Sequence, residues 1–175
     1  IRLNRGRISG ISITQLKPCK SPYHDIFTCF GHQIIAQALG GTVEKFAGGW
    51  AVGRTEYDMD GQTLVLNAWH QDQVTRRPEG ARVLASNAFC ENAILAYDDT
   101  IWTVQPHPEF NADFVHGLIQ TRGRGVVPDD ILAHAEQRLG GPVSSADIAA
   151  RMAAFSSRVW ISVRAISLRA FSSME

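Results

Sequence analysis

The feature that most restricts the fold is a short apolar run that ends at a cysteine and passes directly into a helical pattern. Residues 26–29 are predicted to form a buried strand, and residues 32–39 carry apolar side chains at helical spacing before a Gly-Gly stop. Cys29 is therefore expected at a tight strand-to-helix turn. Gly31 suits such a turn because it has no Cβ atom. This arrangement resembles a nucleophile elbow, which presents a reactive side chain at the end of a sheet.

Strands and helices alternate along the following part of the chain. Strands are expected at residues 50–57, 63–68, 81–86, 93–97 and 101–104, and helices at residues 112–121, 129–139 and 144–155. Alternation of this kind predicts an α/β sheet covered by helices on both faces. A chain of 175 residues fits a single domain spanning residues 1–175.

Cys29 is a candidate nucleophile. A cysteine attacks as a thiolate, and a free cysteine is mostly protonated at neutral pH. The start of a helix favours a negative charge, and a neighbouring histidine can accept the thiol proton. The backbone N–H of Phe30 points into the same space and can donate to an oxyanion. A lone buried cysteine is more often a small core residue, but the Cys-x-Gly-His-Gln string between a strand and a helix favours the nucleophile.

His107 is the candidate base, and Glu109 is its candidate partner. His107 follows the strand expected at residues 101–104 and lies between Pro106 and Pro108, which prevent a helix or a central strand there. The carboxyl ends of strands are where α/β sheets place their sites. In an extended segment residues i and i+2 point the same way, so Glu109 can orient the His107 ring.

Three ordered motifs resemble the class I glutamine amidotransferase family. They are Thr-Cys-Phe-Gly-His-Gln at residues 28–33, Asn-Ala-Trp-His-Gln-Asp-Gln-Val at residues 67–74 and Gln-Pro-His-Pro-Glu at residues 105–109. The resemblance covers about residues 26–155 and is strongest to stand-alone members similar to the glutaminase domain of GMP synthase. It implies an open, mainly parallel, flavodoxin-like sheet. The second motif resembles that family's middle loop, which lines the glutamine pocket.

The resemblance also implies a reaction. Cys29 would attack the side-chain amide of glutamine and form a glutamyl thioester, His107 would carry the proton to the leaving ammonia, and Glu109 would orient His107. The residues expected to bind the substrate are Phe30, Gln33, His70, Gln71 and Asp72. No metal and no organic cofactor is expected. The implied partners are glutamine and a separate synthase subunit that accepts the ammonia.

The ends of the chain depart from the family pattern, at residues 1–23 and 157–175. The family's nucleophile usually follows about three β-α units, whereas 28 residues precede Cys29, with one candidate strand at residues 8–16 and no Gly-Gly-Pro-like loop. We therefore expect a fold truncated at its amino end. Phe27 stands where the family usually has glycine, and residues 159–171 show a strand pattern without a counterpart in the family.

Composition excludes several other classes of function. The net charge is zero, and the basic residues near the two ends lack the interleaved aromatics of a nucleic-acid site. No apolar run approaches the roughly 18 residues needed to span a membrane, and no signal peptide is expected. Three cysteines indicate a reducing, cytoplasmic location. The spacing of Cys19 and His24 does not match a zinc site.

Three readings of function stay open at this point. The first is an active glutaminase, and the second is a degenerate, non-catalytic domain inactivated by truncation. The third is a γ-glutamyl cysteine hydrolase of related fold, since the same Cys-His-Glu chemistry would serve it. An uncovered sheet edge also predicts a homodimer.

Overall fold

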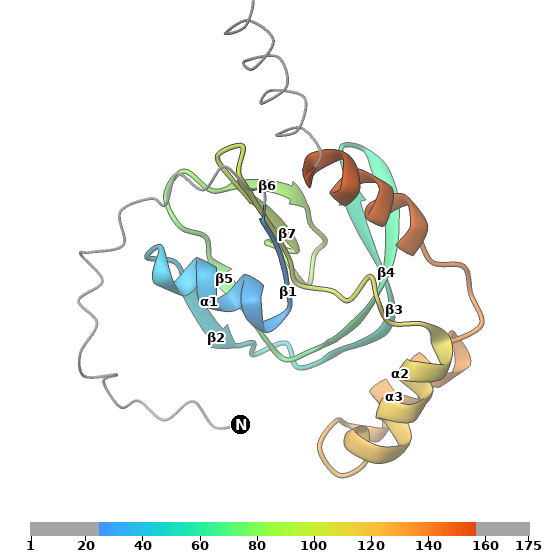
Figure 1. Cartoon of the computed structure of the whole chain (residues 1–175). Helices are drawn as coiled ribbons and strands as arrows, with labels where there is room; N and C mark the ends of the chain where they lie inside the picture. The colour runs from blue at the N-terminus through green and yellow to red at the C-terminus, as the bar shows by residue number, and fades with distance from the viewer. Residues whose placement is uncertain (1–24, 157–175) are drawn as a thin grey trace, which may run out of the picture.

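The computed structural model describes residues 25–156 of the chain (Figure 1). Its strands and helices are β1 (Asp25–Thr28), α1 (Phe30–Ala38), β2 (Thr42–Lys45), β3 (Ala51–Met59), β4 (Gln62–His70), β5 (Asp72–Arg76), β6 (Arg82–Ala85), β7 (Ile94–Tyr97), β8 (Ile101–Val104), α2 (Ala112–Leu118), the π-helical turn η2 (Ile119–Gly123), α3 (Asp129–Gln137) and a final helix at residues 145–156. The strand patterns expected at residues 8–16 and 159–171, together with Cys19 and His24, lie outside the described residues.

Four strands form the central sheet, in the order β1-β8-β7-β6. The predicted α/β class is confirmed, but the strand directions are more mixed than expected. β1 pairs with β8 in parallel, whereas β8 with β7 and β7 with β6 are antiparallel. The reason is the length of the connections, because strands that follow one another through short turns return antiparallel, and a parallel pair needs a long crossover.

Helices cover both faces of this sheet, as predicted. Neighbouring residues of β7 point to opposite sides. Ile94 packs in one cluster with Ile148 of the final helix, and Leu95 packs in another with Ala36 of α1. All four side chains are completely buried. Figure 1 shows α1 and the final helix well apart, with the sheet between them.

A long antiparallel ribbon, β3 and β4, leads away from the sheet and carries α2 and α3 at one end (Figure 1). A tight turn joins the two strands. Asp60 and Gly61 both have positive φ angles, of 56° and 76°, as a two-residue hairpin turn of type I′ requires. The Asp58 carboxylate accepts a hydrogen bond from Gly61 N at 2.9 Å, which stabilises the turn.

A second antiparallel pair, β2 with β5, was not predicted from the sequence. Residues 67–74 resemble the family's middle loop, and only residues 67 and 68 were expected in a strand. They form the end of β4 and the start of β5, with Gln71 alone between the two strands. The segment is rich in polar residues and lacks clear alternation, so its local sequence does not indicate a strand. Pairing with β2 supplies the hydrogen bonds that make it one.

The core between the ribbon and the sheet makes a direct prediction about stability. Leu66 of β4 is completely buried among residues of both, and we expect Leu66→Ala to lower the free energy of unfolding by about 2–5 kcal/mol. Leu39→Ala is the matched control, since Leu39 is 48% exposed, and it should cost well under half as much. Urea unfolding measures both, and equal losses would contradict the packing described.

Candidate active site

Cys29 lies at the turn between β1 and α1, in a strained backbone conformation with φ 44° and ψ −101°. Two hydrogen bonds hold the turn. Cys29 N donates to Val104 O at the end of β8, at 2.7 Å, and Gln33 N donates to Cys29 O at 3.1 Å, which begins the helix. Non-glycine residues in such conformations persist only where the surroundings enforce them, and they concentrate at functional sites.

Phe27 fits beneath this turn because Gly31 has no side chain. A Cβ atom at position 31 would lie 2.9 Å from the Phe27 Cβ, closer than real Cβ contacts. The Phe27 side chain remains 38% exposed. The bulky residue at a position where glycine is usual is therefore compatible with the elbow, provided that position 31 stays glycine.

His107 and Glu109 form a close pair beyond the end of β8. His107 Nδ1 lies 2.7 Å from Glu109 Oε1. An ionised carboxylate can only accept, so the proton of the neutral ring is assigned to Nδ1, and Nε2 is left free to act as a base. The ring of Phe110 stacks on the His107 ring, with centroids 3.9 Å apart and planes 6° from parallel.

Asn67 of β4 fixes the loop that carries this pair. Its backbone carbonyl accepts from His107 N at 2.8 Å, and its side-chain Nδ2 donates to Phe110 O at 2.8 Å. Asn67 is only 4% exposed. The sequence placed it in the second motif without assigning it a function, because an uncharged amide in a strand carries no local signal of so distant a contact.

The other predicted substrate residues lie on α1 and at the junction of β4 with β5. Gln33 Nε2 donates to Asp72 O at 2.8 Å, which joins α1 to the start of β5. His70, at the end of β4, is buried, and burial together with a smaller contribution from the nearby His107 ring lowers its pKa to about 4. The carbonyl of Gln71 accepts from Phe46 N at 3.0 Å.

The Phe30 side chain is 58% exposed, and its backbone N–H faces the Cys29 sulfur.

Gln105 was part of the third motif but was assigned no function from the sequence. It is completely buried directly after β8, and its Nε2 lies 3.8 Å from Cys29 Sγ. Its Oε1 lies 3.2 Å from Gln33 Nε2. The only sequence signal for this residue is a polar amide directly after an apolar strand, which does not reveal its partners.

Burial is the main reason that the pKa of the Cys29 thiol is raised above its usual value. The Phe30 N–H acts in the opposite direction, and the negative charges of Glu109 and Asp72 raise the pKa further. In the absence of substrate the thiol therefore holds its proton, and a base is needed to remove it.

His32, next to Gln33, is buried and bonds Thr103 Oγ1 through Nδ1 at 2.7 Å. Burial lowers the pKa of His32 to about 3, so its ring is neutral at neutral pH.

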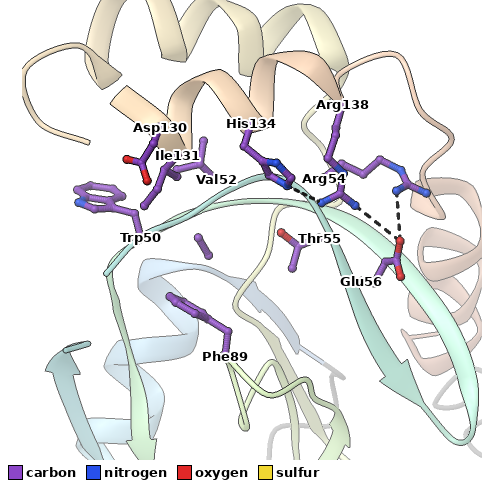
Figure 2. Close-up of a pocket in the computed structure, with 11 residues that line it drawn as sticks. Trp50, Val52, Arg54, Thr55, Glu56, Phe89, Asp130, Ile131, His134 and Arg138 are labelled. Carbon is purple, nitrogen blue, oxygen red and sulfur yellow. Dashed lines mark hydrogen bonds and ion pairs between the residues drawn. The ribbon is translucent and has the colours of Figure 1, made fainter. Parts of the chain in front are cut away.

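A cavity with a volume of about 670 Å³ lies between β3 and α3 (Figure 2). None of the predicted site residues lines it. Three of its charged side chains form ion pairs, since Glu56 contacts Arg54 at 3.3 Å and Arg138 at 3.7 Å, and Asp130 also lines the cavity.

Neither a membrane span nor a metal cluster occurs within residues 25–156. No helix there has the length and apolar character needed to cross a membrane. No group of three or more His, Cys, Asp and Glu side chains in this part of the chain is arranged to hold a metal ion.

Comparison with known proteins places this geometry in a family. The family model for glutamine amidotransferase class-I matches residues 23–114, more than half of the chain. The chain belongs to the class I glutamine amidotransferase family. The matched residues include the Cys29 turn, the β4–β5 segment and the His107–Glu109 pair of this amidotransferase domain.

Several curated proteins are similar to this amidotransferase domain. A glutamine amidotransferase-like protein of Schizosaccharomyces pombe is 30% identical over 136 residues, which are 73% of this chain and 55% of that protein. A glutamine-hydrolysing GMP synthase subunit of Sulfolobus acidocaldarius is 38% identical over 96 residues, 46% of this chain and 48% of the relative. Gamma-glutamyl peptidase 4 of Arabidopsis thaliana is 31% identical over 110 residues, 52% and 42% of the two chains. The chain spans about half the length of these relatives.

Solved structures share the fold. A glutamine amidotransferase from Methylobacillus flagellatus superposes with a TM-score of 0.56 at 21% identity, covering 78% of this chain and 61% of the other. One from Thermotoga maritima gives 0.55 at 19% identity, covering 77% and 61%. These likenesses confirm the predicted fold family.

The electrostatics of the site predict opposite effects of Glu109→Gln on two measurements. The Glu109 charge raises the pKa of Cys29, so its removal should lower that pKa and speed alkylation of Cys29 by iodoacetamide at pH 8. Any reaction that uses the His107 ring as its base should slow by about 10²–10⁴-fold, because His107 loses its orienting carboxylate. Peptide mapping by mass spectrometry measures the alkylation, and Glu91→Gln, at an exposed position, is the matched control. Alkylation that is unchanged or slower would contradict this account.

Proposed function

We propose that the protein hydrolyses the side-chain amide of glutamine through a cysteine thioester, giving glutamate and ammonia. One observation carries the proposal. β1 and β8 are parallel neighbours, so Cys29 at the end of one strand and the bonded His107–Glu109 pair beyond the end of the other lie at the same edge of the sheet. A nucleophile, a base and an orienting carboxylate are the groups that acyl transfer needs.

In the first half of the proposed reaction, His107 Nε2 accepts the Cys29 proton, and the sulfur attacks the amide carbon of glutamine. The Phe30 N–H, which already faces the sulfur, donates to the oxygen that becomes negative. The carbon–nitrogen bond then breaks, the nitrogen takes its proton from His107, and ammonia leaves. The product of this half is a glutamyl thioester on Cys29.

In the second half, water attacks the thioester carbon, with His107 accepting a proton from it. The carbon–sulfur bond breaks, and glutamate is released with the thiol restored. Gln33, His70, Gln71 and Asp72 remain the predicted substrate-binding residues, and the Gln33–Asp72 hydrogen bond, which joins α1 to the start of β5, supports this. Both thiols of the described residues, Cys29 and Cys90, are free, which suits a reducing cytoplasmic location.

The ammonia would pass to an acceptor on a separate synthase subunit. The supporting observation is the similarity to the GMP synthase protein of Sulfolobus acidocaldarius, which is named as a glutamine-hydrolysing subunit of that synthase. The acceptor stays open, since this similarity covers 46% of the chain.

The test of the function combines labelling with turnover. A chloroketone analogue of glutamine should modify Cys29, glutamine should block that modification, and the unmodified protein should release glutamate and ammonia. The Cys29→Ser variant should neither be labelled at position 29 nor turn over glutamine, while keeping its unfolding temperature. A folded wild-type protein with neither labelling nor turnover would support the non-catalytic reading instead.

A γ-glutamyl peptide is the alternative substrate, and the similarity to gamma-glutamyl peptidase 4 favours considering it. The same thioester would form, with an amine of a peptide in place of ammonia as the leaving group. Comparing kcat/KM for glutamine with that for a γ-glutamyl dipeptide separates the two readings. A value at least about tenfold higher for the dipeptide, a difference of roughly 1.4 kcal/mol in transition-state stabilisation, would replace glutamine as the proposed substrate.

The predicted homodimer also remains a proposal, supported by the edge of the sheet. β1 is the outermost strand of the described sheet, and Phe27, Phe30 and Ile34 beside it are exposed apolar residues. We expect light scattering to give the mass of a dimer and Ile34→Glu to give that of a monomer. Val126→Glu, at another exposed apolar position, should leave the dimer intact. A wild-type monomer at assay concentrations would rule the dimer out.

A further inference from the structure

Hydrogen bonds hold both the backbone and the side chain of Gln105. Its backbone N donates to Ala93 O at 2.7 Å, and its side chain is completely buried. A buried amide without hydrogen-bond partners costs about 1–3 kcal/mol, and this one has partners at both of its polar atoms. One of these partners is the sulfur of the candidate nucleophile.

The direction of the amide follows from a backbone atom. Asp72 O can only accept, so the Gln33 atom that lies 2.8 Å from it is the donor Nε2. The same NH₂ group lies 3.2 Å from Gln105 Oε1. Because the oxygen of Gln105 faces a donor, its own NH₂ group faces Cys29 Sγ. A chain of donors therefore runs from Gln33 through Gln105 to the sulfur.

We propose that Gln105 is a positioning residue, which holds the Cys29 sulfur toward the substrate and favours its thiolate, and that Gln33 fixes the direction of the Gln105 amide. An N–H donor bonds a thiolate more strongly than a neutral thiol, so it favours the charged form. The inference rests on the proposed function for its use in catalysis, but the state of the resting thiol can be measured without any turnover.

The surroundings of the sulfur explain why such a donor is needed. Burial and the charges of Glu109 and Asp72 all disfavour the thiolate, and the Phe30 N–H is the counteracting group in the first turn of α1. In the proposed reaction the Phe30 N–H turns to the substrate oxygen. Gln105 then remains as the donor on the sulfur, at the moments when sulfur carries charge before attack and after release.

The test measures the pH dependence of Cys29 alkylation by iodoacetamide, read on the Cys29 peptide by mass spectrometry. Gln105→Met keeps the length of the side chain and removes the donor. We expect its profile to move to higher pH and its rate at pH 7 to fall about 3- to 10-fold, the effect of losing one hydrogen bond. Gln37→Met, at an exposed position of α1, should match the wild type.

Gln33→Met provides a second, independent variant. Gln33 does not contact the sulfur, yet its loss frees the Gln105 amide to rotate, so the profile should move in the same direction by a smaller amount. Circular dichroism and thermal unfolding check that each variant is folded. If Gln105→Met fails to fold, an unchanged profile in folded Gln33→Met overturns the proposal.

The outcomes separate this inference from the proposed function. A shifted profile in protein that does not hydrolyse glutamine would support the positioning role of Gln105 and overturn the proposed glutaminase activity. Glutamine turnover together with an unchanged profile in folded Gln105→Met would support the glutaminase activity and overturn the positioning role.

Discussion

The hydrogen bond from Cys29 N to Val104 O, 2.7 Å long, is the contact on which the candidate site depends. It continues the parallel pairing of β1 with β8 by one residue, and so brings the carboxyl ends of two strands from distant parts of the chain to one edge. The first strand supplies the sulfur, and the second leads into the loop with the imidazole and its carboxylate. An antiparallel pairing would have placed them at opposite ends of the sheet.

The β3–β4 ribbon provides the second support. Asn67 bonds the His107 loop through both its backbone and its side chain, and the same strand buries Leu66 in the core shared with the sheet. The position of the imidazole is therefore coupled to the packing of the whole domain. A loop held only by Pro106 and Pro108 would be stiff, but its direction would not be determined.

Around the sulfur, most of the buried polar groups are uncharged. The Gln105 amide lies between the Gln33 amide and a thiol whose pKa is raised chiefly by burial, and the buried rings of His32 and His70 are neutral. In such surroundings the Cys29 thiol keeps its proton until a base removes it. Fixed dipoles can then favour the thiolate without an additional buried charge, which would cost far more to desolvate.

The sequence by itself determined the Cys29 elbow, the bounds of β8, the rigid His-Pro-Glu loop and the α/β class. These depend on local rules, namely apolar periodicity, glycine at a crowded turn and proline on both sides of a histidine. Only the tertiary structure decided the mixed strand directions, the β2–β5 pair and the contacts of Asn67 and Gln105. Gln33 and Gln105 lie 72 residues apart in sequence, and an uncharged amide has no local pattern that indicates its partner. Their meeting depends on which strands become neighbours, and long-range pairing sets that order.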